Sequence, residues 1–402
     1  MKTLFFIAAL LGMLGCGNQN NPSTPNNQNN RNTLSAESDS LSLDEDIGMM
    51  LLVGFRGTEI DYNKNIEIIS ALRDYHVGSV ILFDYDVPTG TRGRNIKDAD
   101  QLKRLCKQLR SFATVDSLLI GIDQEGGYVS RLSTRYGFPA IPSAQKCAAK
   151  GDDTVRYYAD FTGRMLQEIG INLDFAPVAD VNVNPRCPVI GGIERSFSSD
   201  PAVVRRCCLI WANELRNHNV ISCFKHFPGH GSAKGDTHKG LVDVTDTWQR
   251  CELEPYRMTN ENFYVTPYEE PLFGYTIPGM VMTAHVINRK LDPSGLPASL
   301  SPKITSYLRD TLGYDGVIVT DDLAMGAIVQ QYSFEKAVRM AVMAGADLLC
   351  LSNNGGTYDV NMVPRAVKVI KQMVADGEVT EERIRQSANR VRVPGLKEHT
   401  VW

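Results

Sequence analysis

Eight short apolar runs separated by helical patterns constrain the fold of this chain more than any other feature. The runs are continuous rather than alternating, which is typical of strands buried on both faces of a parallel sheet. Strands that alternate with helices predict an α/β fold, a single (β/α)8 barrel of the TIM type, with a doubly wound open sheet as the alternative. The predicted strands are residues 50–55, 78–83, 118–123, 173–178, 220–224, 279–285, 316–321 and 346–351.

The helical patterns place apolar side chains three and four residues apart on one face. Between residues 98 and 114, for example, Leu102, Leu105 and Leu109 share a face. The first predicted strand is the least distinctive, because its sequence MLLVGF is also compatible with a continuing helix. The long connection 246–278 carries aromatic residues and prolines, which predicts an ordered excursion over the surface. The other predicted helices are 66–75, 154–169, 201–217, 302–312, 333–344, 360–374 and 380–392.

The first 44 residues are typical of export and tether segments. The apolar run from Leu4 to Leu14 predicts a signal peptide and is too short to span a membrane. Gly15-Cys16 resembles the lipobox of bacterial lipoproteins, whose cysteine is acylated; the alternative is a plain secretory signal. Residues 17–33 contain no aliphatic or aromatic side chain, which predicts disorder. The predicted domains are a lipoprotein signal peptide (1–16), an Asn-rich tether (17–44), the barrel (45–393) and a C-terminal tail (394–402).

The composition excludes some partners and some chemistry. A net charge of −4 gives no basic surface to attract nucleic acid. From the signal peptide and the lipobox-like Gly15-Cys16 pair we expect an exported monomer in the bacterial cell envelope that contacts the membrane only through its lipid anchor. Cys106, Cys223 and Cys350 lie in apolar patterns, which favours buried free thiols, although export also permits disulfides. No C-x-x-C pair occurs, so a zinc ribbon or a thioredoxin-like site has no support.

Ionisable residues lie at the carboxyl ends of the predicted strands, where the active site of a TIM barrel is built. They are Asp123, Asp174, His226, His285 and Asp321. For two of them a structural role is as well supported as a functional one. Asp174 can accept hydrogen bonds from backbone amides, and His285 can be a satisfied buried group. Five apolar runs that each end on or just before an ionisable residue are nevertheless more than chance placement would give.

The stretch KHFPGHGSAKGDTHKGL, residues 225–241, is too polar and glycine-rich for a core element. A metal site would use His226, His230, Asp236 and His238, but Pro228-Gly229 prevents the helix that would align the first two. A phosphate cradle would need a Walker pattern, which is absent. An aspartate two residues from a histidine can orient the imidazole and stabilise its cation. We therefore favour a catalytic loop over a structural loop, and both over a metal site.

Two adjacent carboxylates, Asp321 and Asp322, end the strand 316–321. Successive residues of a strand point in different directions, so we expect different roles for them. One carboxylate nucleophile and one separate proton donor are the minimum for retaining glycoside hydrolysis. The structural alternative is a cap on the following helix, a role that fits Asp322 better than Asp321.

Several motifs resemble glycoside hydrolase family 3, and most of all its bacterial β-N-acetylhexosaminidase branch. The resemblance covers roughly residues 45–393 and implies a (β/α)8 barrel without the second α/β domain of longer family members. It implies an exo-acting, retaining β-N-acetylglucosaminidase that trims amino-sugar glycans such as peptidoglycan fragments and needs no metal or organic cofactor. The motifs are MLLVGFRG (50–57), DQEGG (123–127), RSFSSDP (195–201), KHFPGHG (225–231), DTH (236–238), VMTAH (281–285), PASLS (297–301) and TDDLAM (320–325).

The resemblance also implies a role for each matching residue. Asp321 is implied as the nucleophile, and His238 as the acid/base with Asp236 as its partner. The residues implied to bind the sugar are Asp123, Arg131, Arg195, Lys225 and His226.

The sequence also departs from the family pattern. Tyr128 stands where the family commonly has arginine, and Thr237 replaces a serine. A neutral histidine repels phosphate less than a carboxylate does, so a phosphorylase is an alternative. A glycan-binding lipoprotein without turnover is another alternative.

Overall fold

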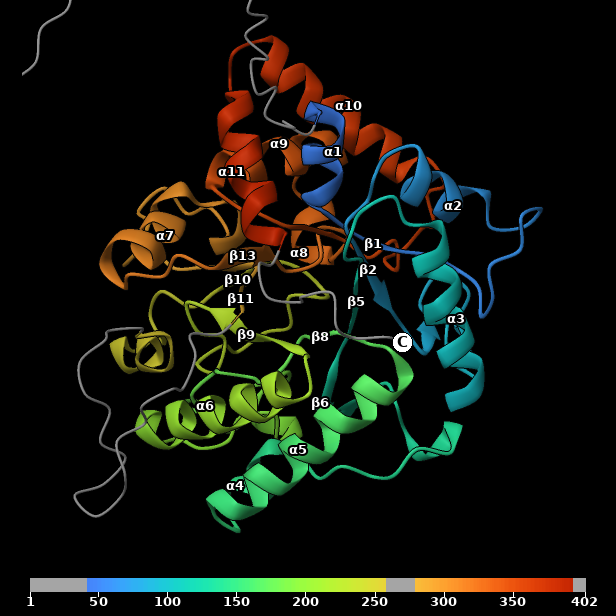
Figure 1. The fold of residues 1–402 in the computed structure, drawn as a ribbon. Helices are drawn as coiled ribbons and strands as arrows, with labels where there is room; N and C mark the ends of the chain where they lie inside the picture. The colour runs from blue at the N-terminus through green and yellow to red at the C-terminus, as the bar shows by residue number, and fades with distance from the viewer. Residues whose placement is uncertain (1–41, 258–278, 393–402) are drawn as a thin grey trace, which may run out of the picture. The chain divides into compact units, whose positions relative to one another are not determined.

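A computed structural model describes residues 42–257 and 279–392 of the 402-residue chain. Eight parallel strands form one sheet in the order β13-β11-β9-β8-β5-β2-β1-β14 (Figure 1). Each barrel strand therefore lies beside the barrel strand that precedes it in the sequence. The two ends of the sheet meet where Thr320 N donates to Leu348 O over 3.0 Å. The strands are β1 (Leu51–Gly54), β2 (Ser79–Leu82), β5 (Leu119–Ile122), β8 (Leu173–Asp174), β9 (Ile221–Phe227), β11 (Met280–Thr283), β13 (Val317–Thr320) and β14 (Leu349–Leu351).

All eight predicted strands are confirmed, and the TIM-type barrel with them. The ambiguous segment around MLLVGF divides into both predicted structures, because helix α1 (Leu43–Met49) ends just before β1 begins. Strand β9 is longer than predicted and includes Lys225 and His226. Lys225 pairs with Met282 of β11 and with Val178 after β8, and His226 lies at an irregularity in the β9–β11 register. The polar stretch at 225–241 therefore begins inside the barrel wall rather than in a loop.

The helices lie outside the strands, and α5 packs beside α6 (Figure 1). The predicted helical segments are all helical, and residues 302–311 are an α-helix that continues as a π turn. The α-helices after α1 are α2 (Ile66–Arg73), α3 (Ala99–Phe112), α4 (Ala144–Ala148), α5 (Asp152–Ile169), α6 (Pro201–Asn217), α7 (Pro302–Ser306), α8 (Gly326–Val329), α9 (Phe334–Ala344), α10 (Met362–Ala375) and α11 (Glu381–Val391).

Short elements occupy the loops at the carboxyl ends of the strands. They include the hairpins β3–β4 and β6–β7, the strand pair β10–β12 and several turns of 3₁₀-helix. Their bounds are β3 (Tyr85–Asp86), β4 (Thr91–Arg92), β6 (Gln124–Gly126), β7 (Val129–Ser130), β10 (Val242–Asp243), β12 (Val286–Ile287), η1 (Thr134–Tyr136), η2 (Gly191–Ile193), η3 (Arg250–Tyr256) and η4 (Ala298–Leu300). The π turn η5 (Tyr307–Thr311) instead continues helix α7.

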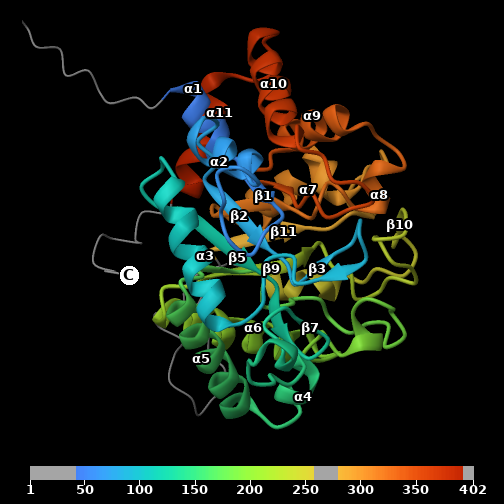
Figure 2. The same cartoon turned by 90° about the vertical axis from the view of Figure 1, so that its right-hand side faces the viewer.

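Helix α1 begins two residues before the predicted start of the barrel at 45. Ser42 caps it by accepting from Glu45 N, while the Glu45 carboxylate accepts from Ser42 N over 2.7 Å, forming a capping box. The helix packs against α11, so the first and last helices of the barrel lie side by side (Figures 1 and 2).

The core has an inner and an outer layer. Inside the barrel, alternate residues of the strands pack together, among them Leu52, Leu119 and Val319. The intervening strand residues pack outward against the helices. Cys106, Cys223 and Cys350 are buried free thiols, as predicted, and all eight cysteines of the described residues are unpaired. Trp211 is also buried, packing beside Phe197.

Several predictions concern residues outside the described part of the chain. The signal peptide with Cys16, residues 17–41 of the tether, residues 258–278 of the long connection and the C-terminal tail all lie there. The described part of the long connection contains the 3₁₀-helix η3. Within residues 42–257 and 279–392, no helix combines the length and the apolar character needed to cross a membrane.

Candidate active site

A pocket of about 490 Å³ opens at the carboxyl ends of the barrel strands. It brings together the predicted catalytic and sugar-binding residues, which come from β9 and from the loops after β5, β8, β9 and β13. The predicted residues that line it are Asp123, Arg131, Arg195, Lys225, His226, Asp236, His238 and Asp321.

A chain of paired charges forms the floor of the pocket. Lys225 Nζ lies 2.8 Å from Asp123 Oδ1 and 2.7 Å from Glu125 Oε1. Arg195 then binds Glu125 with both Nε and Nη2, each over 2.7 Å. Bidentate and charge-assisted bonds of this kind fix the side chains in one geometry. The floor thus presents fixed donors and acceptors to a small polar ligand.

The charge pairs decide which carboxyl groups of the floor are ionised. Burial favours the neutral carboxyl form, but Lys225 and neighbouring arginines outweigh it and hold the pKa values of Asp123 and Glu125 below their usual range. Asp174 lies beneath them without such a partner, and burial raises its pKa well above its usual range. Asp174 accepts from Gln124 N over 2.9 Å and does not line the pocket, so the backbone-binding explanation is confirmed for it.

Arg131 closes one side of the floor. Its Nη2 lies 3.3 Å from Asp123 Oδ2, and its Nη1 lies 3.7 Å from Asp84 Oδ1. Its guanidinium also covers the Phe83 ring, with 5.7 Å between the guanidinium carbon and the ring centroid. The residue thus links the loop after β5 to the loop after β2.

Two histidines of the KHFPGHG segment are held by one buried carboxylate, Asp180. Its Oδ2 lies 2.7 Å from His226 Nδ1, and its Oδ1 accepts from His230 N over 2.7 Å. His226 turns its Nε2 toward Arg195 and the pocket. Burial and the neighbouring His226 lower the pKa of His230 to about 4, so this ring is neutral at pH 7. The His226 ring thus pairs with Asp180, whereas His230 binds Asp180 through its backbone and turns its ring Nε2 to Thr237 Oγ1, 3.2 Å away.

Asp236 and His238 form a pair at the mouth of the pocket. Asp236 Oδ1 lies 2.9 Å from His238 Nδ1 and also accepts from His238 N over 2.9 Å. Burial opposes ionisation of Asp236, but the bonds from His238 hold its pKa below the usual range. The pairing at Nδ1 leaves Nε2 as the nitrogen that can exchange a proton with a ligand.

The segment that carries His238 rests on helix α8. Ala327 N donates to Thr237 O over 3.0 Å, and Gln330 Nε2 donates to Lys239 O over 2.9 Å. Gly326 allows this approach, because a Cβ atom there would lie only 2.5 Å from His238 O. The position of His238 thus depends on the element that follows Asp321.

Asp321 is the first of two adjacent carboxylates after β13, and both line the pocket. Its amide donates to Thr283 O over 2.9 Å, and its Oδ1 accepts from Asp322 N over 2.8 Å. Burial opposes its ionisation, but His285, His226 and His238 together hold its pKa below the usual range. It is therefore an ionised, partly buried carboxylate beside imidazoles, which suits a nucleophile.

The prediction that Asp322 caps the following helix is wrong. Helix α8 begins only at Gly326, with Met325 at its cap position. Asp322 instead accepts from Ala324 N over 3.1 Å and from the Ser352 hydroxyl, which ties the turn to the end of β14. His285 is a satisfied buried group, since its ring nitrogens contact Ser299 Oγ and Asp322 O.

Sequence reasoning missed several residues of the site. Glu125 lies inside the quoted DQEGG motif, and its charge two residues after Asp123 was an available signal. Asp180 interrupts the apolar run after β8, which also marks it as a buried polar residue. Tyr85 and Val87, in the β3–β4 hairpin, carry no comparable signal.

A family model decides how this site is classified. The model described as "Glycosyl hydrolase family 3 N terminal domain" matches residues 42–393. The chain belongs to glycosyl hydrolase family 3. The match spans the whole barrel, including every residue described above for the pocket.

Individual relatives in glycosyl hydrolase family 3 carry hexosaminidase names. Beta-hexosaminidase LpqI of Mycobacterium tuberculosis is 31% identical over 87% of this chain and 82% of its own length. Beta-hexosaminidase A of Pseudoalteromonas piscicida is 30% identical over 81% of this chain, which spans only 54% of that relative. The structure of a family 3 beta-N-acetylglucosaminidase from Paenibacillus matches with a TM-score of 0.75 and 32% identity, covering 88% of this chain and 62% of that one.

Proposed function

We propose that this family member is a retaining, exo-acting β-N-acetylglucosaminidase, in the wider class of β-N-acetylhexosaminidases, that releases terminal GlcNAc from amino-sugar glycans. The observation that carries the proposal is that Asp321 and the Asp236–His238 pair line one pocket. A nucleophile and a separate proton donor around one cavity are what the double displacement requires. The hexosaminidase names of the relatives support the choice of sugar.

The chemistry divides into two steps. In the first, a carboxylate oxygen of Asp321 attacks the anomeric carbon while His238 Nε2 gives its proton to the departing oxygen, so the glycosidic bond breaks and a glycosyl-enzyme forms. In the second, water gives a proton to His238 and attacks the same carbon, which frees Asp321 and GlcNAc. Asp236 holds the imidazole and stabilises its cation between proton transfers.

The floor of the pocket binds the sugar. Lys225, His226 and Asp123 offer donors and acceptors to the ring hydroxyls and the N-acetyl group, and Arg131 and Arg195 complete the pocket. Because these groups already pair with one another, they are oriented before the substrate arrives.

The test compares aryl β-N-acetylglucosaminide with aryl β-glucoside, each with and without inorganic phosphate. We expect the aryl group to be released from the N-acetyl substrate at a rate that does not depend on phosphate. Asp321→Ala should lose nearly all of this activity. Release that requires phosphate would instead establish a phosphorylase, the alternative favoured by a histidine rather than a carboxylate at the acid/base position. Binding of the sugar without release would establish a glycan-binding protein.

We also propose that the chain is a lipoprotein of the bacterial cell envelope, acylated at Cys16 and monomeric. The Gly15-Cys16 pair after the apolar run supports this proposal. Labelling of the full chain with a fatty-acid analogue tests it, and we expect Cys16→Ala to abolish the label. Label that persists in this variant would contradict the proposed anchor.

A further inference from the structure

The mouth of the pocket carries exposed apolar side chains, whereas its floor is charged. The structure describes ten large apolar side chains that are exposed, and three of them line this pocket: Tyr128 (80% exposed), Val87 (52%) and Tyr85 (37%). Lys225 on the floor, by contrast, has a side chain that is 2% exposed. Apolar groups gathered at the rim of a polar cavity are typical of a ligand contact.

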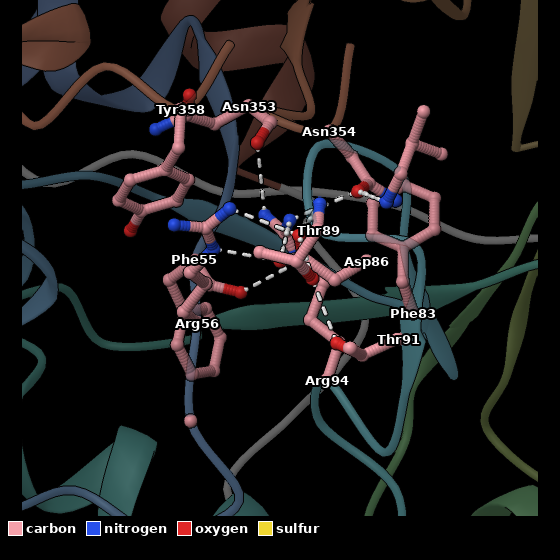
Figure 3. Close-up of polar contacts among 12 residues, drawn as sticks. Phe55, Arg56, Phe83, Asp86, Thr89, Thr91, Arg94, Asn353, Asn354 and Tyr358 are labelled. Carbon is pink, nitrogen blue, oxygen red and sulfur yellow. Dashed lines mark hydrogen bonds and ion pairs between the residues drawn. The ribbon is translucent and has the colours of Figure 1, made fainter. Parts of the chain in front are cut away.

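The hairpin that carries two of these residues is held rigidly. An isolated hairpin as short as β3–β4 is unstable in water, but Asp86 in its first strand accepts bonds from two arginines. Arg56 binds Asp86 with Nε over 2.7 Å and Nη2 over 2.9 Å, and Arg94 Nη1 binds it over 2.9 Å (Figure 3). Burial opposes ionisation of Asp86, but Arg56 and Thr89 outweigh it and hold its pKa below the usual range.

A second contact fixes the backbone at the two rim residues themselves. Asn354, after β14, donates from Nδ2 to Tyr85 O over 3.0 Å and accepts at Oδ1 from Val87 N over 2.9 Å. Arg94 Nη1 donates to the same Oδ1 over 2.9 Å, which joins Asn354 to the Asp86 cluster (Figure 3). The rim is thus oriented before any ligand binds, and pre-organisation of this kind lowers the cost of binding.

The rim and the floor meet through the loops after two neighbouring strands. Tyr85 follows β2 and Tyr128 follows β5, and these strands pair directly. The Tyr136 hydroxyl donates to Asp84 O over 3.2 Å, and Arg131 also faces Asp84, so the two loops are in contact. Tyr85, Val87 and Tyr128 therefore border one opening rather than separate surfaces.

The charges around the opening indicate an uncharged ligand. Among the described residues that line the pocket, each lysine or arginine is already paired: Lys225 with Asp123 and Glu125, Arg195 with Glu125, and Arg131 with Asp123. Carboxylates and phosphates are recognised in proteins mainly by arginine or lysine that remains available to them. Tyrosine and valine instead offer flat and aliphatic surface.

We propose that Tyr128, Tyr85 and Val87 form the binding surface for the leaving group, and that this surface takes a neutral pyranose ring through its apolar face. This inference rests on the proposed function and names its substrate class: β-linked GlcNAc whose neighbouring residue is an uncharged sugar. Asp86 acts as a positioning residue, because it holds the hairpin and does not line the pocket.

The experiment compares two substrates that share GlcNAc but differ in the leaving group. One is the β-1,4-linked GlcNAc disaccharide, and the other is the β-azide of GlcNAc, whose leaving group is too small to reach the rim. In Tyr128→Ala we expect kcat/KM for the disaccharide to fall by roughly 3- to 10-fold, with the azide unchanged. Tyr128→Phe should retain the disaccharide activity. Tyr157→Ala, which removes an exposed tyrosine on α5, is the matched control and should change neither substrate.

The remaining outcomes are also decisive. Asp86→Ala should also lower kcat/KM for the disaccharide selectively. If Asp86 had a merely structural role, its loss would lower kcat/KM for both substrates equally. Equal losses on both substrates in Tyr128→Ala, or no loss on the disaccharide, would overturn the proposal. If the wild-type chain prefers a disaccharide with a carboxylate on the leaving sugar, the proposal that this surface takes a neutral sugar is overturned. Failure of the wild-type chain to release azide would contradict the proposed function itself, and this inference with it.

Discussion

Lys225 Nζ lies 2.8 Å from Asp123 Oδ1, joining strand β9 to the end of β5 beneath the pocket. The same ammonium group lies 2.7 Å from Glu125 Oε1. This cation is therefore shared by two carboxylates, which Arg131 and Arg195 also contact, and the two carboxylates add to the burial that raises the pKa of Asp174. Removing a single partner from such a cluster leaves the remaining charges less well compensated, which costs far more than losing an exposed pair.

We predict that Lys225→Met lowers the free energy of unfolding by about 3–5 kcal/mol, because Asp123 and Glu125 lose their shared cation. Chemical denaturation at pH 7 measures the loss. Lys64→Met is the matched control, since Lys64 pairs with Asp61 in solvent, 3.0 Å away, and such pairs contribute about 0–1 kcal/mol. A loss in Lys225→Met as small as that of the control would contradict this account of the floor.

Asp236 should affect catalysis through His238. We expect Asp236→Ala to lower kcat by about 10² to 10³ on substrates with poor leaving groups, because the imidazole loses the partner at its Nδ1. Activated aryl substrates should lose much less, since their leaving groups need little protonation. A series of aryl substrates with leaving groups of different pKa measures the difference as a steeper slope of rate against that pKa.

The control for Asp236 is Asp243→Ala, which removes an exposed aspartate that pairs with Arg289 further along the same segment. It should leave the slope unchanged. An Asp236→Ala variant with a uniform loss across all leaving groups would show that Asp236 does not act through proton transfer.

Gly326 is predicted to be intolerant of any side chain. A Cβ atom at this position would lie 2.5 Å from His238 O and 3.1 Å from the Lys239 carbonyl carbon, both backbone atoms. Gly326→Ala should therefore displace His238 and lower kcat on poor leaving groups by about tenfold or more. Gly356→Ala, where a Cβ meets no atom within 4 Å, is the control. Equal activity of the two variants would show that the close approach is unimportant.

The sequence predicts the barrel and the lining of the pocket because both follow local rules. Each strand is an apolar run buried on both faces, so its position is visible without tertiary information. Asp123 and Asp321 follow such runs directly, so the strand positions alone place them at the carboxyl end of the barrel. The cap predicted for Asp322 failed because a turn of several residues separates it from α8.

The hairpin at the mouth illustrates what local rules miss. Tyr85 and Val87 gain their positions from Asn354, which is 269 and 267 residues away in the sequence. The Asp86 cluster likewise joins loops after β1, β2 and β14, and no periodicity in the sequence marks such a set. The partners of Asp180 were hidden for a related reason, because His226 on β9 and His230 in the loop after it are 46 and 50 residues away in the sequence.

Glu252 predicts a pH dependence of stability. This residue of η3 is fully buried beside the KHFPGHG segment, where its Oε2 accepts from Ser232 N over 3.3 Å. Burial raises its pKa from 4.5 to about 7, with Asp180 adding repulsion. The folded state thus holds a proton that the unfolded state releases above pH 4.5, so the stabilisation is complete below that pH and is lost as pH rises through 7.

We therefore expect Glu252→Gln, which stays neutral at every pH, to gain stability relative to the wild-type chain between pH 5 and pH 8. The gain approaches about 3 kcal/mol, because one pKa unit corresponds to about 1.4 kcal/mol. Denaturation at pH 5.0 and pH 8.0 measures it. Glu254→Gln, on the same 3₁₀-helix but paired with Arg205 near the surface, should show no such gain. If the two variants depend on pH alike, Glu252 is ionised in the folded protein and its burial is compensated by other contacts.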